Sequence, residues 1–127
     1  KAISILKRLF GEDNKYLQML DCKASEFSYG EQRLIALASL LMGNDTLLLL
    51  DEPTAGVNPV YINTIGEIIH KMVEEDGLTV LLIEHNMHFV RKIADNCAYL
   101  DDGVIAKTGS VVEVLDDREG RNSYLGI

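Results

Sequence analysis

Two adjacent carboxylates follow an uninterrupted apolar run near the middle of the chain. Leu47 to Leu50 are four consecutive leucines, and Asp51 and Glu52 come directly after them. Such a run predicts a strand buried on both faces, as in a parallel sheet, although it also fits a core strand with a polar exit. Pro53 ends this strand just past its carboxyl end, where open α/β sheets place their ligands. The acids are therefore expected at a crevice mouth, where their oxygens suit metal and phosphate chemistry.

A helix start upstream is a second candidate site. Ser28 and Glu31 have the spacing of a capping box, in which the serine side chain accepts from the Glu31 backbone N–H and the glutamate reaches back. Gly30, inside the first turn, lets another backbone or a ligand approach closely. Exposed N–H groups and the helix dipole would then favour an anion. The alternative is a helix cap with no further role.

Four motifs, in one order, resemble those of the ATP-binding cassette (ABC) ATPases. Residues 28–32, Ser-Tyr-Gly-Glu-Gln, are similar to the signature loop, and residues 47–52 are similar to the Walker B strand with its catalytic glutamate. Residues 81–85, Leu-Leu-Ile-Glu-His, resemble the switch-histidine strand. The position of the D-loop holds Ala55, Gly56, Val57 and Asn58. The resemblance implies a partial P-loop NTPase fold of the α/β class, a mostly parallel sheet flanked by helices.

The resemblance extends to the ATPase subfamily of branched-chain amino acid importers. It is carried by Ser-Tyr-Gly, by Ala-Gly-Val-Asn-Pro, by Ile-Glu-His-Asn-Met and by the terminal Tyr124, Leu125 and Gly126. It implies an ATP-binding and ATP-hydrolysing subunit of a transporter, an importer of amino acids or similar small solutes. Its expected partners are a second nucleotide-binding subunit, as a homo- or heterodimer, and transmembrane permease subunits. Its expected place is the cytoplasmic face of the membrane, as a peripheral protein.

The resemblance also assigns roles to single residues. Asp51 would hold Mg²⁺ through coordinated water, and Glu52 would be the general base that polarises the attacking water. His85 would reach the γ-phosphate region and position both water and base. The residues expected to contact ATP held by the partner subunit are Ser28, Gly30 and Glu31. Each residue also has an alternative without a role in catalysis. Asp51 could cap a turn, Glu52 could be a solvated acid, His85 could be structural, and the start at Ser28 could be a plain helix cap.

Several positions depart from the general family pattern. Tyr29 stands where most of the superfamily has glycine, Glu31 replaces the usual glutamine, and Asn58 replaces the common D-loop aspartate. Leu34 and Ser39 occupy helix positions that carry arginine in relatives. The tyrosine and the asparagine are habits of the branched-chain subfamily. These changes are expected to leave the fold intact.

The sequence has no G-x-x-x-x-G-K-[S/T] loop to cradle phosphates. We therefore expect the C-terminal half of a longer nucleotide-binding domain, and we expect this chain alone not to hydrolyse ATP. Residues 1–43 are expected to be the C-terminal part of the helical subdomain, with the signature loop and helix. Residues 44–127 are expected to be the C-terminal half of the ATPase core, with Walker B, D-loop, switch histidine, hairpin and last helix.

Local signals predict the other elements. A first helix is expected to end at Gly11, a short helix should follow near Tyr16, and the signature helix should run to Met42. The helix that begins at Asn58-Pro59 has its apolar face at Ile62, Ile65, Ile69, Met72 and Val73 and should end at Gly77. The later elements are a second buried strand over 78–83, a helix with Phe89, Val90, Ile93 and Ala94, a hairpin around Asp101-Asp102-Gly103, and a helix boxed by Ser110 and Glu113.

Composition narrows the function classes. With 47% hydrophobic residues the chain is expected to fold, and its net charge of −8 argues against nucleic acid and anionic membrane surfaces as partners. No apolar run approaches the roughly 20 residues of a membrane span, so direct insertion is not expected. Cys22 and Cys97 lack metal-site spacing and are expected to be reduced thiols.

Two other functions keep the same motifs. One is a non-enzymatic interaction fragment, and the other is a soluble ABC ATPase of DNA repair or translation. The repair type would show a long heptad coiled coil before the signature, and the translation type a second cassette. Neither pattern is present in these 127 residues.

Overall fold

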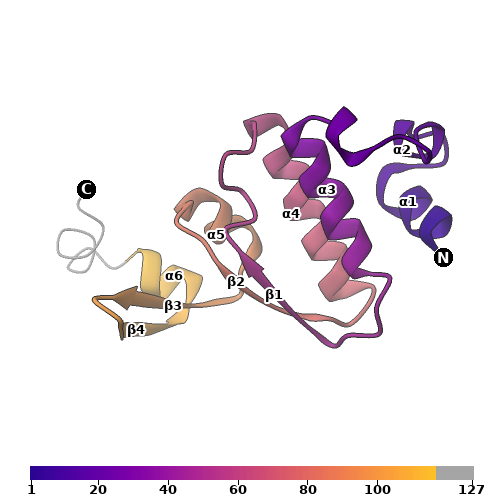
Figure 1. Ribbon diagram of the computed structural model, residues 1–127. Coiled ribbons are helices and arrows are strands. Elements are labelled where there is room, and N and C mark those ends of the chain that lie inside the picture. The colour runs from indigo at the N-terminus through magenta and orange to yellow at the C-terminus, as the bar shows by residue number, and fades with distance from the viewer. Residues whose placement is uncertain (117–127) are drawn as a thin grey trace. The chain divides into compact units, whose positions relative to one another are not determined.

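The computed structural model describes residues 1–116, which fall into two compact units (Figure 1). The first unit comprises Lys1–Glu84, and the second begins at His85. The terminal Tyr124-Leu125-Gly126 therefore lies outside the described residues. The boundary expected between residues 43 and 44 falls inside the first unit, and the assignment of its parts to subdomains stays a prediction.

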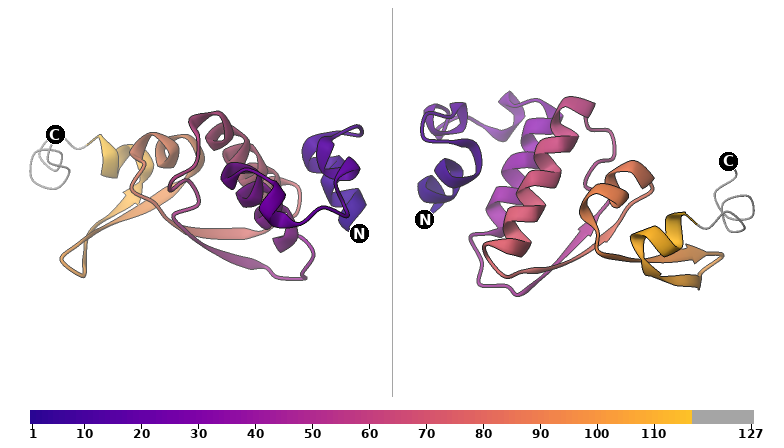
Figure 2. Two further views of the ribbon diagram at one scale, coloured as in Figure 1. Left: turned by 45° about the horizontal axis from the view of Figure 1, so that its top comes forward. Right: turned by 180° about the vertical axis from the view of Figure 1, so that it is seen from behind.

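Helices dominate the first unit. Its helical elements are α1 (Ala2–Phe10), α2 (Lys15–Gln18), the 3₁₀ turn η1 (Ala24–Glu26), α3 (Tyr29–Leu40) and α4 (Pro59–Glu74). In Figure 1 and in both views of Figure 2, α3 and α4 lie side by side. Leu34 and Leu37 of α3 and Ile65, Ile69 and Met72 of α4 are buried, so these two helices supply a large part of the core.

The remaining helices of this unit are fixed by aromatic and ionic contacts. Tyr16 packs between Phe10 and Phe27, with ring centroids 4.5 and 6.0 Å away. The guanidinium of Arg8 donates two hydrogen bonds to the carboxylate of Asp76, at 2.7 and 2.8 Å. A planar fork of this kind matches a carboxylate geometrically, so α1 is held to the turn that follows α4.

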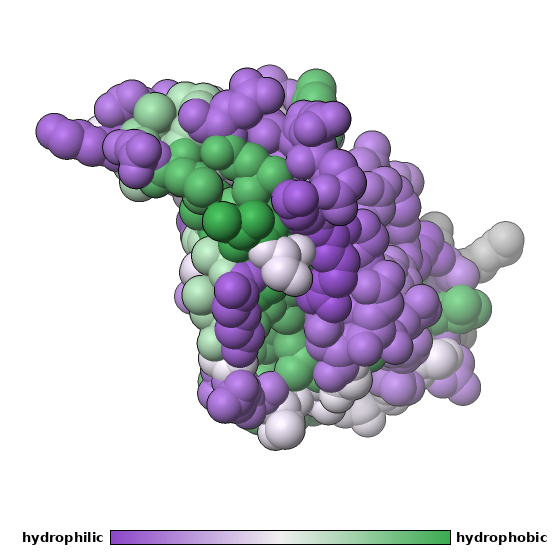
Figure 3. All heavy atoms as spheres, turned by 90° about the vertical axis from the view of Figure 1, so that its right-hand side faces the viewer, coloured by the Kyte–Doolittle hydropathy of each residue, from purple (hydrophilic) through white to green (hydrophobic). Residues whose placement is uncertain are grey.

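Two strands, β1 (Leu47–Asp51) and β2 (Thr79–Ile83), pair in parallel. The prediction that both are buried on two faces is wrong. Leu48 and Leu50 are buried, but Leu47 is 51% and Leu49 70% exposed, and Leu81 and Ile83 of β2 are 62% and 65% exposed. The reason is that the first unit covers one face only, where α4 contacts β2. Figure 3, which views the molecule from the right-hand side of Figure 1, shows a patch of apolar side chains among hydrophilic ones.

Element ends are set by local capping. The predicted caps are confirmed at Gly11, which has φ 94°, and at Asn58, whose side chain accepts from the Val60 N–H. Helix α3 ends at Leu40 instead of Met42. Helix α4 ends at Glu74, before Gly77, whose φ of 67° serves the turn into β2. Among residues 1–116 no helix is both long and apolar enough to cross a membrane.

The second unit is a hairpin with two short helices. Its elements are α5 (Met87–Ile93), β3 (Asn96–Asp101), β4 (Val104–Ser110) and α6 (Val111–Leu115). The predicted tight turn is confirmed, since Asp102 and Gly103 have φ of 44° and 78°, the positive values of a type I′ turn. The capping box of Ser110 and Glu113 is confirmed as well. Val90, Val111, Val114 and Leu115 form a buried cluster in this unit, and Phe89 is buried as well.

The exposed face of β1 and β2 predicts self-association of the 127-residue chain. Leu47, Leu49, Leu81 and Ile83 together leave a contiguous apolar surface on one side of the sheet. We expect concentration-dependent oligomers in light scattering, and a shift toward monomer for Leu49→Lys. Val60→Lys, at an exposed position outside the sheet, is the control and should leave the oligomers unchanged. A monodisperse parental monomer at high concentration would contradict this expectation.

Candidate functional site

The two acids predicted to do chemistry lie at the carboxyl edge of the parallel pair. Asp51 is the last residue of β1 and stands opposite Ile83, the last residue of β2. The next N–H, that of Glu52, donates to the Ile83 carbonyl oxygen at 2.9 Å and so extends the ladder by one bond. Both acids are exposed. The structure thus brings Asp51 and Glu52 together at the strand end, as the sequence predicted.

Glu52 has an unusual backbone conformation. Its φ is 43°, in the left-handed region that non-glycine residues adopt rarely and at a cost of about 1–3 kcal/mol. The chain turns sharply here, and the Ala55 N–H donates back to the Glu52 carbonyl oxygen at 3.1 Å. Pro53 and Thr54, inside the turn, are buried. The side chain of Glu52 therefore projects from a backbone that is fixed on both sides.

Glu84 has a role that the sequence did not reveal. The backbone N–H and the hydroxyl of Thr54 both donate to Oε1 of Glu84, at 2.8 and 2.6 Å. From the sequence, Glu84 was assigned no role of its own. The signal that could have found it is its place directly after the second parallel strand, at the same sheet edge as the turn that follows β1.

His85 belongs to the other unit. It is the residue that follows Glu84 in the chain, it begins the second unit, and it is exposed. Its predicted part in positioning water beside Glu52 stays a prediction.

The start of α3 has the predicted capping box. The Ser28 N–H donates to Oε2 of Glu31 at 2.8 Å, and the Glu31 N–H donates to the Ser28 hydroxyl at 3.4 Å. The Glu31 carboxylate also forms an ion pair with Lys15 and accepts from the Tyr61 hydroxyl at 3.4 Å. Its side chain is buried, whereas Ser28 is exposed. The buried Glu31 thus stabilises this turn from inside, and the exposed Ser28 forms part of its surface.

The space expected at Gly30 is filled by a side chain of the same unit. A Cβ atom added to Gly30 would overlap the ring of Tyr61, with Cε2 3.0 Å away and Cδ2 closer. On its Cβ side the neighbour of Gly30 is therefore an aromatic ring at the start of α4, and the expected contact of Gly30 with a ligand stays a prediction. Glycine is required because α3 and α4 approach closely at this point.

The segment predicted as the D-loop lies beside the start of α3. Gly56 has φ 68°, and the position of a Cβ there is 3.6 Å from Cε1 of Tyr29. Ala55 is partly exposed, Val57 is buried, and Asn58 caps α4. The Tyr29 hydroxyl accepts two hydrogen bonds from the Arg33 guanidinium, at 3.0 and 2.6 Å. Two motifs some 30 residues apart in the sequence therefore form one surface.

The donor set fits a magnesium ion that is bound mainly by other ligands. Residues 1–116 contain no cluster of three or more histidine, cysteine, aspartate or glutamate side chains that could hold a metal. Mg²⁺ commonly takes one or two carboxylates, several waters and substrate phosphates, so it needs no such cluster. The exposed oxygens of Asp51 are donors of the right kind for that arrangement.

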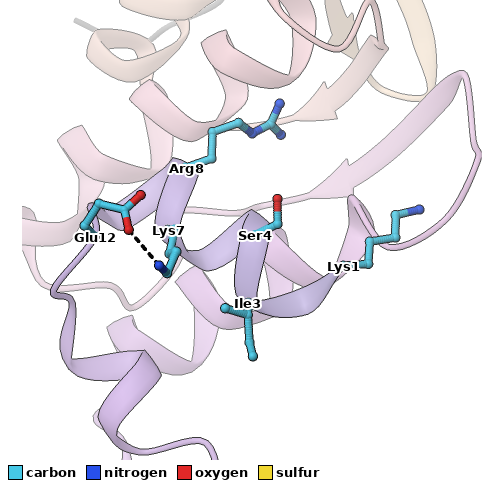
Figure 4. Close-up of a pocket in the computed structure, with 6 residues that line it drawn as sticks. All are labelled: Lys1, Ile3, Ser4, Lys7, Arg8 and Glu12. Carbon is cyan, nitrogen blue, oxygen red and sulfur yellow. Dashed lines mark hydrogen bonds and ion pairs between the residues drawn. The ribbon is translucent and has the colours of Figure 1, made fainter.

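A surface hollow lies elsewhere, along α1 (Figure 4). It is lined by Lys1, Ile3, Ser4, Lys7, Arg8 and Glu12. Lys7 pairs with Glu12 at 2.7 Å, and Arg8 is held by Asp76. Because these charges are already paired and none of the predicted site residues lines the hollow, we assign it no part in the site.

Comparisons with known proteins point to one class of ATPase. A family described as AAA domain, putative AbiEii toxin, type IV TA system matches residues 20–91. The branched-chain amino acid transport ATP-binding proteins BraF and BraG of Pseudomonas aeruginosa are 32% and 38% identical to this chain. The alignments cover 91% and 82% of this chain but 45% and 44% of those proteins. The chain thus spans about half the length of these relatives.

Solved structures agree with these relatives. An ATP-binding cassette of an ABC transporter, in its ADP conformation, matches this chain with a TM-score of 0.81 at 30% identity. The match covers 100% of this chain and 49% of the cassette. The protein cbiO1 from Clostridium perfringens, part of the transporter complex cbiONQ, has a TM-score of 0.77 at 27% identity, over 96% and 47% of the two chains. The α/β fold predicted from the sequence is confirmed.

The contact between Gly30 and Tyr61 predicts a coupled pair of substitutions. Gly30→Ala should destabilise the chain by about 1–3 kcal/mol through overpacking, less the roughly 0.5–1 kcal/mol that alanine gains in a helix. In a Tyr61→Ala background the same change should be neutral or stabilising, because the ring is gone. Urea denaturation of the four proteins measures the coupling, and additive effects would show that the two residues do not interact.

Proposed function

We propose that this chain, which belongs to the family of ABC transporter ATP-binding domains, is part of the ATP-hydrolysing subunit of an ABC transporter. One observation carries the proposal: Asp51 ends β1 and Glu52 follows it, at the edge where Glu84 follows the parallel partner β2. Paired acids at the carboxyl edge of a parallel sheet suit phosphate chemistry in the presence of a metal. Since the chain spans about half of its relatives, the activity is proposed for the longer protein.

We propose a role in ATP hydrolysis for Glu52, Asp51 and His85. Glu52 would orient the attacking water and accept a proton from it. The backbone of Glu52 is held in place by its hydrogen bond to the Ile83 carbonyl. Asp51 would hold Mg²⁺ through water, and the ion, when bound, neutralises charge that develops on the phosphates. His85 would position water and base, as the resemblance of its motif implies.

The start of α3 would act on nucleotide bound by a second subunit. Ser28 is exposed at the helix N-terminus, where free N–H groups and the helix dipole favour phosphate oxygens. Gly30 would keep the turn close to α4, and Glu31 would hold its shape through the capping box. The neighbouring residues of the D-loop, 55–58, would share this contact surface. ATP binding would then close a dimer, and hydrolysis would reopen it.

The named relatives support our proposals for the transported solute and the partners. Relatives that serve branched-chain amino acid transport support an importer of amino acids or similar small solutes. A structural neighbour that is part of a transporter complex supports assembly with permease subunits. We place the protein at the cytoplasmic face of the membrane, held there by those subunits, with a second ATP-binding subunit as its other partner.

The other functions are less well supported. The family description mentions a toxin of a type IV TA system, but the relatives and structures described above belong to transporters. A non-enzymatic interaction fragment, or a soluble ATPase of DNA repair or translation, would keep the same motifs. The mass of the native protein and a search for a P-loop in frame upstream of Lys1 separate the interaction fragment from an ATPase. A long heptad coiled coil before the signature would indicate the repair type, and a second cassette the translation type.

The 127-residue chain by itself should bind Mg-ATP weakly or not at all. The sequence has no G-x-x-x-x-G-K-[S/T] cradle for the phosphates, and a ligand stabilises a protein only in proportion to its affinity for the native state. Thermal melts with and without millimolar Mg-ATP should therefore coincide. A rise of several degrees would place the nucleotide on residues of this chain and would contradict the expectation.

In the full-length protein, Glu52→Gln should separate binding from hydrolysis. The substitution keeps the size of the side chain but removes the base, so turnover should fall by roughly two or more orders of magnitude. ATP binding should persist, and the ATP-bound dimer should accumulate in gel filtration. Ser28→Arg should instead prevent dimer formation, by filling the surface offered to the partner's nucleotide.

The matched control is Glu67→Gln, an exposed acid on α4. It should hydrolyse ATP at the parental rate. A Glu52→Gln protein that also turns over at the parental rate would remove Glu52 from the catalytic role.

A further inference from the structure

We propose that Glu84 is a positioning residue, whose carboxylate fixes Thr54 and thereby the backbone that carries Glu52. The inference rests on the proposed function and adds a residue to the same site. Both hydrogen-bond donors of Thr54, its N–H and its hydroxyl, meet one oxygen of Glu84 at 2.8 and 2.6 Å. Thr54 is 6% exposed and Glu84 is partly buried, so the two donors of Thr54 have little access to water. Hydrogen bonds to an ionised carboxylate are roughly twice as strong as neutral ones.

Together with a second hydrogen bond, this contact holds the backbone on both sides of Glu52, and we call the two anchors the bracket. On one side, the N–H of Glu52 is bound to the carbonyl of Ile83 at 2.9 Å. Two residues further on, Thr54 is bound to Glu84. Ile83 and Glu84 are consecutive, so both anchors belong to the same strand end. A left-handed φ of 43° at Glu52 persists only where its surroundings hold the backbone from both sides, and the bracket does so.

The same bracket fixes the segment that follows. The Val57 N–H donates to the Thr54 carbonyl at 3.1 Å, so the turn through residues 55–57 starts from the anchored threonine. The base and the proposed dimer-contact loop therefore share one support. The buried leucines of β1 and the core of α3 and α4 do not depend on it. Loss of the contact should shift the turn without unfolding the unit.

The test measures ATP hydrolysis by the full-length protein. Thr54→Val removes the hydroxyl donor, Glu84→Ala removes the acceptor, and Thr54→Ser keeps both donors of residue 54. A general base displaced by about 1 Å can lose up to 100-fold in rate, so kcat should fall roughly 10- to 100-fold in the first two variants, while KM for ATP stays at the parental value. Thr54→Ser should retain the parental kcat.

A second pair of variants keeps the test decisive. The double variant Thr54→Val/Glu84→Ala should be no slower than Glu84→Ala alone, because Glu84→Ala already removes both hydrogen bonds of Thr54. Glu84→Gln keeps the size and one acceptor oxygen, so it decides the question if the alanine variant does not fold, and its kcat should fall less. The matched controls are Thr79→Val and Glu67→Ala, at exposed positions of β2 and α4, which should keep the parental kcat.

The outcomes separate this inference from the proposed function. Glu52→Gln is measured in parallel under the same conditions. If Glu52→Gln is inactive while Thr54→Val and Glu84→Ala or Glu84→Gln keep the parental kcat, the positioning role is overturned and the proposed function stands. The positioning role is also overturned if KM for ATP rises as kcat falls, or if Thr54→Ser loses the parental kcat. If the parental full-length protein does not hydrolyse ATP, the proposed function itself fails, and if it does but Glu52→Gln is fully active, the catalytic role of Glu52 fails.

Discussion

The parallel pairing of β1 with β2 is the interaction on which the rest of the site depends. Its register places Asp51 opposite Ile83, and the bond from the Glu52 N–H to the Ile83 carbonyl adds one more step. A shift of one residue would turn Leu48 and Leu50 to the open face, because side chains alternate along a strand. The same shift would separate Thr54 from Glu84. The burial of the leucines and the geometry of the acids are therefore secured by one register.

Features that involve neighbouring residues could be predicted from the sequence. The two capping boxes, at Ser28 and at Ser110, join residues three positions apart, and Asn58 caps the helix that it precedes. The turn at Asp102-Gly103 depends on the positive φ that these residue types tolerate. Both parallel strands and the position of Asp51 and Glu52 were also predictable, since apolar runs that end in acids and proline mark the carboxyl edge of a sheet.

Contacts between distant segments could not be read in this way. Thr54 and Glu84 are 30 positions apart, and only the strand register shows that they meet. The ring of Tyr61 beside Gly30 requires the packing of α3 on α4. Four identical leucines carry no periodicity, so the sequence could not show that Leu47 and Leu49 lie on an exposed face. The resemblance to ABC ATPases named the chemistry of the edge but not Glu84, the residue that supports it.

The most direct test of the account is to locate the metal and the nucleotide. The full-length protein would be crystallised with Mn²⁺ in place of Mg²⁺ and with an ATP analogue that is not hydrolysed, and the manganese located by anomalous scattering. The account predicts a manganese peak beside Asp51, with the terminal phosphate facing Glu52 at the carboxyl edge of β1 and β2. Metal and nucleotide bound away from this edge, with Asp51 and Glu52 facing solvent, would contradict it.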